Sequence, residues 1–145
     1  MKKILSTILA AGMVLGLSGM AMAGDLATGT ANVSAYVADY AAITGLGDIT
    51  IDPFTGTAGE EQSGSDMFHV ETNCAATITV SGTQLTQVED TIATTFDVDN
   101  AGLSTPVAAK SNADHTVTVT GTLGAISGQA SGNYSSTVTV TVSTI

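Results

Sequence analysis

The chain has 145 residues, with 3 Lys or Arg against 13 Asp or Glu, a formal net charge of -10 and a single Cys. This length suits one domain, and hydrophobic residues at 43% with charged residues at only 11% exclude a charge-expanded disordered chain. So acidic a surface repels phosphate, which excludes nucleic acid as a partner, and one Cys excludes a disulfide framework within the chain.

The first 23 residues have the order of a secretory signal peptide. Lys2 and Lys3 form a basic start, an apolar stretch follows, and Ala21 and Ala23 are the small residues that precede a cleavage site. A membrane anchor is the alternative, but the apolar run is shorter than the ~20 residues that a span needs. We therefore expect cleavage after Ala23 and no membrane span in the mature chain, residues 24–145.

Cleavage leaves Lys110 as the one basic residue beside 13 carboxylates. Salt bridges therefore cannot hold the domain together, and anionic lipid surfaces are poor partners. Two of the carboxylates, Glu60 and Glu61, lie in a stretch rich in Gly, Thr and Ser, which predicts a mobile, hydrated loop tip.

Period-two alternation dominates the mature chain. Val or Ile alternates with Thr, and all three are β-branched residues that favour strands over helices. In a strand this pattern places the aliphatic side chains on one face and the Thr side chains on the other. We predict strands, in chain order, in residues 31–37, 48–52, 68–71, 77–81, 95–99, 115–120 and 136–142.

Clusters of Gly, Ser, Asn, Ala and Thr separate these stretches and predict turns. They occupy residues 55–59, 63–65, 81–82, 100–102, 111–112, 127–128 and 131–132. About seven short amphipathic strands between such turns are typical of two antiparallel sheets packed face to face. We therefore predict that residues 24–145 form an all-β, antiparallel, immunoglobulin-like β-sandwich, with its Thr side chains facing water.

No group of residues in the sequence indicates an enzyme. We place His69 and His115 on the polar faces of their strands, and the sequence has no nucleophile elbow, no HExxH and no phosphate loop. Cys74 has no His close to it in sequence, so we expect it to pack as a small buried residue, with a disulfide to another chain as the alternative. We expect no catalytic residue and no cofactor.

A weak calcium motif begins at Asp97. The sequence DVDNAG over residues 97–102 partly resembles a calcium-binding loop, but Ala101 stands where a ligand is needed and no Glu occupies the twelfth position. Asp97 and Asp99 are therefore weak calcium candidates, and an Asx-type turn is the alternative.

Three motifs together resemble the secreted immunoglobulin-like subunits of bacterial surface fibres. Residues 132–142 are similar to the G-x-Y-x-x-x-V-x-V-x-V ending of chaperone–usher pilins and of spore coat protein U-like proteins. Residues 43–51 resemble the segment after the first strand of those families, and residues 70–80 resemble their second core strand. The resemblance covers most of residues 30–145.

This resemblance implies an exported structural subunit of a surface fibre, pilus or extracellular coat, which reaches the cell surface through the periplasm. Its partners would be other copies of the chain, with a periplasmic chaperone and an outer-membrane usher as further candidates. Copies would join by strand addition, in which one chain donates a strand to an open sheet edge of the next.

The candidate donor is the N-terminal segment, residues 27–37; the alternative is that residues 24–37 contain the domain's own first strand. The candidate assembly residues are Gly29, Ala31 and Val33 in that segment and Val138, Val140 and Val142 in the last strand. A secreted binding module that recognises carbohydrate or a surface protein is the second functional hypothesis, although the chain has no Trp and few other aromatic residues.

Overall fold

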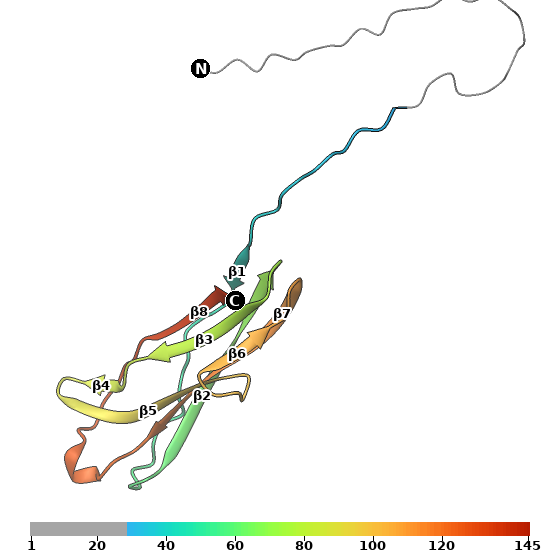
Figure 1. Cartoon of the computed structure of the whole chain (residues 1–145). Coiled ribbons are helices and arrows are strands. Elements are labelled where there is room, and N and C mark those ends of the chain that lie inside the picture. Colours follow the sequence, from blue (N-terminus) through green and yellow to red (C-terminus); the bar gives the residue numbers. More distant parts are fainter. Residues whose placement is uncertain (1–28) are drawn as a thin grey trace, which may run out of the picture. The chain divides into compact units, whose positions relative to one another are not determined.

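The computed structural model describes residues 29–145, so the expected signal peptide, residues 1–23, lies outside the described residues. Residues 29–145 are all-β and antiparallel, with one short 3-10 turn at Ile126–Gly128 (Figure 1). One sheet has the strand order β1-β2-β7-β5-β4 and the other has the order β6-β3-β8. The strands are β1 Ala41–Thr44, β2 Glu61–Thr72, β3 Ala76–Gly82, β4 Leu85–Gln87, β5 Asp90–Val98, β6 Ser104–Val107, β7 Ser111–Thr122 and β8 Val138–Thr144.

The chain divides into two units, Met1–Ala35 and Tyr36–Ile145. The described part of the first unit, residues 29–35, forms no strand and its side chains are exposed. All the strands belong to the second unit.

The long ladder between β2 and β7 organises the five-stranded sheet. It runs from the pair Glu61↔Thr122 to the pair Thr72↔Ser111. Along β7 the side chains of Val117 and Val119 are buried while the Thr residues between them are more exposed, as the alternation predicted.

The core lies between the two sheets. Phe68 and Val70 of β2 and Val117 of β7 contribute from the five-stranded sheet, and Ile78 and Val80 of β3 contribute from the three-stranded sheet. Three half-buried side chains of β8 pack against this core: Val138, Val140 and Val142. The two sheets are therefore joined mainly by aliphatic contacts.

The predicted strand over residues 48–52 is absent. Ile49 and Ile51 are half-buried and their neighbours are exposed, so the alternation does reflect which side chains face inward. However, no backbone hydrogen bond joins this stretch to another part of the described chain. The period-two pattern here records burial without strand pairing.

The predicted turn over residues 63–65 is also wrong, because these residues lie inside β2. Gly64 faces the interior, and a Cβ atom built on it would collide with the carbonyl group of Thr50. The glycine is required by this close approach of two backbones and not by a turn.

The predicted strand over residues 31–37 does not form in the described chain, where the first strand begins at Ala41. Its large side chains are exposed to water: Val33 at 92%, Tyr36 at 88% and Val37 at 77%.

Candidate functional site

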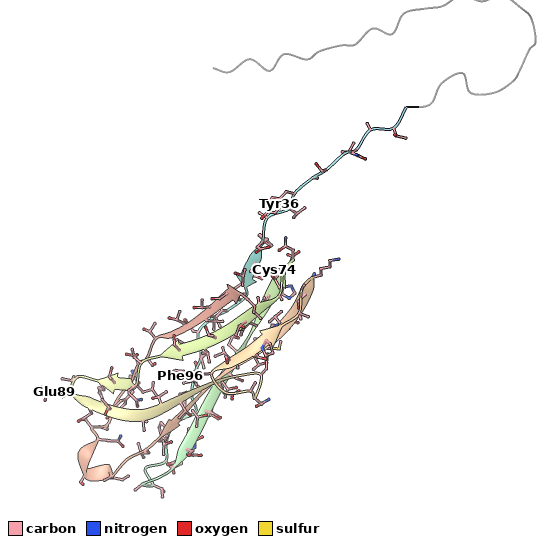
Figure 2. The ribbon with its side chains drawn as sticks, viewed as in Figure 1. Tyr36, Cys74, Glu89 and Phe96 are labelled. Carbon is pink, nitrogen blue, oxygen red and sulfur yellow. The ribbon has the colours of Figure 1, made fainter. Side chains whose placement is uncertain are left out.

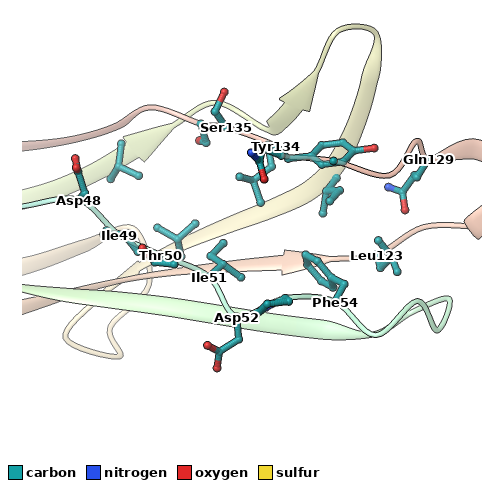
Figure 3. Close-up of a pocket in the computed structure, with 18 of the residues that line it drawn as sticks. Asp48, Ile49, Thr50, Ile51, Asp52, Phe54, Leu123, Gln129, Tyr134 and Ser135 are labelled. Atoms are coloured by element: carbon teal, nitrogen blue, oxygen red, sulfur yellow. The ribbon is translucent and has the colours of Figure 1, made fainter.

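A groove with a volume of about 990 Å³ lies over β4, β5 and β7 of the five-stranded sheet. Figure 3 shows the residues that line it. Residues 46–54, which follow β1, form its first wall, and residues 129–138, which lead into β8, form its second wall. Leu85 of β4, Ile92 of β5 and Val119 of β7 form an apolar floor.

The first wall turns its apolar side chains toward the groove. Ile51 and Phe54 point into it, whereas the carboxylate of Asp52 points away (Figure 3). The backbone N–H of Gly47 donates to Oδ2 of Asp66 at 2.6 Å and attaches the start of this wall to β2. Within residues 29–145, the wall has no backbone partner for its own N–H and C=O groups.

Glu60 fixes the loop at the far end of the first wall. Its carboxylate accepts hydrogen bonds from the backbone N–H groups of Thr55 at 2.9 Å, Gly56 at 3.1 Å and Thr57 at 3.2 Å, and from Nε2 of Gln62 at 2.9 Å. These bonds, that of the Thr55 backbone first, lower the pKa of Glu60 from 4.5 to about 2. The prediction of a mobile loop tip at this position is therefore wrong for Glu60.

The second wall is paired on one side only. Ser135 and Thr86 exchange two backbone hydrogen bonds at 2.9 and 3.0 Å, and the carbonyl of Thr137 accepts from the N–H of Thr83 at 3.2 Å. Tyr134 and Ser136 alternate with these residues, and their backbone groups have no backbone partner in the described chain.

Tyr134 is held in place by its side chain. Its hydroxyl donates to the carbonyl of Ala130 at 2.9 Å. Burial, and then the nearby charge of Asp90, raise the pKa of Tyr134.

The groove therefore combines an apolar floor with two walls that carry unsatisfied backbone groups. An extended peptide between the walls could hydrogen-bond to both and place alternate side chains on the floor. Sequence patterns could not show this site, because its walls come from segments that are about eighty positions apart in the chain and are not strands in this region.

The predicted assembly residues lie in two places. Val138, Val140 and Val142 face the core from β8, a strand that pairs with β3 on one edge and has no strand on its other edge within the described chain. Gly29, Ala31 and Val33 are exposed, and a Cβ atom on Gly29 would meet nothing within 4 Å.

The carboxylates of Asp97 and Asp99 bind protein groups. Oδ2 of Asp97 accepts from the N–H of Gly102 at 2.7 Å, and Oδ1 of Asp99 accepts from the N–H of Thr116 at 2.9 Å. Within residues 29–145 no three His, Cys, Asp or Glu side chains gather where they could hold a metal ion. The bonded N–H groups lie five and seventeen positions along the chain, so neither bond is that of an Asx-type turn, in which the carboxylate binds the backbone two residues on.

The two His residues differ in their surroundings. His69 is half-buried and lies on the face of β2 opposite Phe68 and Val70, as predicted. Asp114 lies 2.8 Å from its Nδ1, a hydrogen bond that raises the pKa of His69. The prediction is wrong for His115, which lies on the inward face with Val117; its Nδ1 is 2.6 Å from Asp99 and its ring centroid is 5.8 Å from that of Phe68. The sequence did contain an indication of this: His115 and Val117 are two residues apart, and side chains with this spacing lie on the same face of a strand.

Cys74 is a free thiol and is half-buried, so it is less buried than predicted. It lies in the turn after β2, where its Sγ is 3.4 Å from Oγ1 of Thr72. The turn exposes one side of the residue, because the chain leaves the sheet there before β3 begins.

The fold and the groove define an all-β antiparallel sandwich with one incompletely paired layer. Comparisons with protein-family models, with curated proteins and with solved structures found no match for this chain. Across residues 29–145, no helix has the length and apolar character needed to cross a membrane.

Proposed function

We propose that this protein is an exported, immunoglobulin-like structural subunit of a bacterial surface fibre, pilus or extracellular coat. Copies join by strand addition, with the N-terminal segment, residues 27–37, of one copy lying in the groove of the next. The observation that carries this proposal is the groove itself, in which two walls with unpaired backbone groups flank an apolar floor.

The composition of the N-terminal segment fits such a slot. Its alternate residues from Gly29 to Val37 are Gly, Ala, Val, Ala and Val, and it contains no charged residue. In an extended conformation these small side chains would share one face and meet the floor. Val33 and Val37 are exposed in the single chain, and their burial would be favourable by roughly 25 cal/mol for each Å² removed from water.

Shortening the segment tests its role. Deletion of residues 26–30 should abolish polymers and leave a soluble monomer, and Gly29→Leu should weaken assembly in part, because a large side chain replaces a hydrogen atom at the floor. Size-exclusion chromatography of the secreted protein measures both effects. Unchanged polymers from the deletion variant would overturn strand addition by this segment.

A peptide experiment tests the groove directly. A synthetic peptide of residues 27–37 should bind the chain that lacks residues 24–37 and raise its melting temperature in proportion to the logarithm of peptide concentration. The matched control is the same peptide with Val33→Asp, which places a charge on the apolar floor and should not bind. Equal effects of the two peptides would contradict specific binding of the segment in the groove.

A secreted carbohydrate-binding module is the second candidate, because Phe54 and Tyr134 both line the groove. Aromatic rings with polar groups nearby suit sugar rings. This alternative predicts a monomer whose melting temperature rises with an oligosaccharide and does not change with the peptide.

A further inference from the structure

Asn73 binds the chain immediately before β1 through three hydrogen bonds. Its Oδ1 accepts from the backbone N–H of Tyr40 at 2.7 Å, and its Nδ2 donates to the carbonyl of Ala38 at 2.8 Å. Its own backbone N–H donates to the carbonyl of Tyr40 at 3.2 Å. Thr72 adds a fourth contact, from its Oγ1 to the same carbonyl at 2.9 Å. We call residues 72 and 73 the clamp.

The clamp imitates a neighbouring strand. β1 pairs with β2 up to the pair Ala41↔Thr72, and beyond this pair the side-chain amide of Asn73 supplies both the acceptor and the donor that a further strand residue would have supplied. The backbone from Ala38 to Tyr40 is therefore held in line with β1, although it is not itself a strand. Tyr36 and Cys74 lie at this end of the sandwich, and Glu89 lies at the other (Figure 2).

This restraint matters because the N-terminal segment is tethered to a domain that has its own groove. The nine described residues 29–37 reach about 30 Å when extended. Only the four residues of β1 and Gly45 separate residues 38–40, which the clamp holds, from the first wall. A flexible tether of this kind gives an effective concentration of the order of mM, far above that of another copy in dilute solution. With a free hinge at residues 38–40, the segment would enter its own groove and close the copy as a monomer.

We propose that Asn73 is a positioning residue that prevents this self-closure. By fixing residues 38–40 in line with β1, it stops the chain from reversing there and keeps the N-terminal segment for the groove of a second copy. This role rests on the proposed strand addition. It adds the reason why the N-terminal segment enters the groove of another copy and not the groove of its own chain.

Two substitutions at Asn73 remove one or both of its side-chain hydrogen bonds and should therefore reduce polymer formation by different amounts. Asn73→Asp keeps the acceptor for Tyr40 and loses the donor to Ala38, whereas Asn73→Ala loses both side-chain bonds. Each lost bond should lower the ratio of polymer to self-closed monomer about fivefold. This factor in an equilibrium constant corresponds to the net contribution of one ordinary hydrogen bond. The matched control is Asn112→Ala, an exposed residue at the same end of the sandwich, on β7 opposite Glu71, which should polymerise normally.

A second variant leaves the clamp intact, in case the Asn73 variants fold poorly. Insertion of Gly-Gly between Val37 and Ala38 gives the segment a flexible hinge outside the clamp and should also produce self-closed monomers. In both kinds of variant the 27–37 peptide should bind the monomer less well than it binds the chain lacking residues 24–37, because the segment already occupies the groove.

Chromatography and peptide binding separate the possible failures. If the peptide binds the shortened chain but the Asn73→Ala variant and the Gly-Gly insertion both polymerise like the original chain, the role of the clamp is overturned and strand addition stands. If the peptide does not bind the shortened chain, strand addition into this groove is overturned, and the clamp with it.

Discussion

The space between the two sheets has a filled half and an open half. In the filled half, Phe68 and Val70 meet side chains from β3 and β8, and both layers there consist of hydrogen-bonded strands. In the open half, Ile92 and Val119 face two walls that are not paired with each other. Val, Ile and Thr build both halves, so hydrophobic burial alone does not close a sandwich; the facing layer must also be paired through its backbone.

Glycines explain where the open half begins. The inward positions of β2 and β7 that hold Phe68 and Val117 in the filled half hold Gly64 and Gly121 further along. A Cβ atom on Gly121 would lie 3.0 Å from the ring of Phe54 and 3.2 Å from Leu85. The missing side chains let the first wall approach the sheet and leave room for the groove.

The largest expected effect is in the filled half. Phe68→Ala should lower the free energy of unfolding by about 3–5 kcal/mol, because the buried ring leaves a cavity in the core. This is a large part of the ~5–15 kcal/mol that stabilises a typical domain. Urea denaturation measures the change, and Met67→Ala, at the exposed neighbouring position, is the control and should cost less than about 0.5 kcal/mol. Equal losses from both variants would show that the inward and outward faces of β2 are wrongly assigned.

An intermediate effect is expected where the first wall meets β2. Gly64→Ala should destabilise the protein by about 1–3 kcal/mol, because the added methyl group collides with the backbone of Thr50. It should also reduce binding of the 27–37 peptide, since the wall must move. At an unconstrained strand position Gly→Ala stabilises by about 0.4–1 kcal/mol. A stabilising change would therefore contradict the close approach of Gly64 and Thr50, and a destabilising change would support it. Ser65→Ala, on the exposed face, is the matched control for both measurements.

The smallest effect concerns the anchor of the same wall and depends on pH. Because folding lowers the pKa of Glu60 from 4.5 to about 2, the ionised carboxylate contributes stability that is fully present well above pH 4.5 and is lost as pH falls through about 2. Glu60→Gln should therefore lower the melting temperature at pH 7 by a few degrees, and the difference should shrink as pH falls and vanish only below about pH 2. A difference that stays constant over this range would show that charge is not what holds the loop.

The strand positions could be predicted from sequence where alternation coincides with pairing. Residues 77–81 and 115–120 lie within β3 and β7, because Val and Ile at every second position find a facing sheet. Residues 48–52 show the same alternation and form no strand, because the space beside them contains no partner. Period two reports which side chains are buried and cannot report whether a neighbouring backbone is present.

The groove and the clamp were harder to predict for a related reason. Gly64 reads as a turn residue in the sequence, because close approach to Thr50 depends on a segment fourteen positions earlier. Asn73 falls between the predicted strands 68–71 and 77–81, where no pattern marks it, and its side chain binds residues more than thirty positions away. The preference of a residue for turns or strands depends on its near neighbours in sequence, so it cannot predict either of these long-range contacts.

The charge distribution of the chain has a kinetic consequence for copies joined in the proposed way. The chain has a net charge of -10, whereas residues 29–37 are neutral. Two approaching copies repel each other over a screening distance of about 8 Å at physiological ionic strength, but an inserted neutral segment gains or loses little Coulomb energy. Added salt should therefore accelerate the encounter and leave the lifetime of the joined state unchanged, so that ionic strength controls when a fibre grows and not how long it lasts.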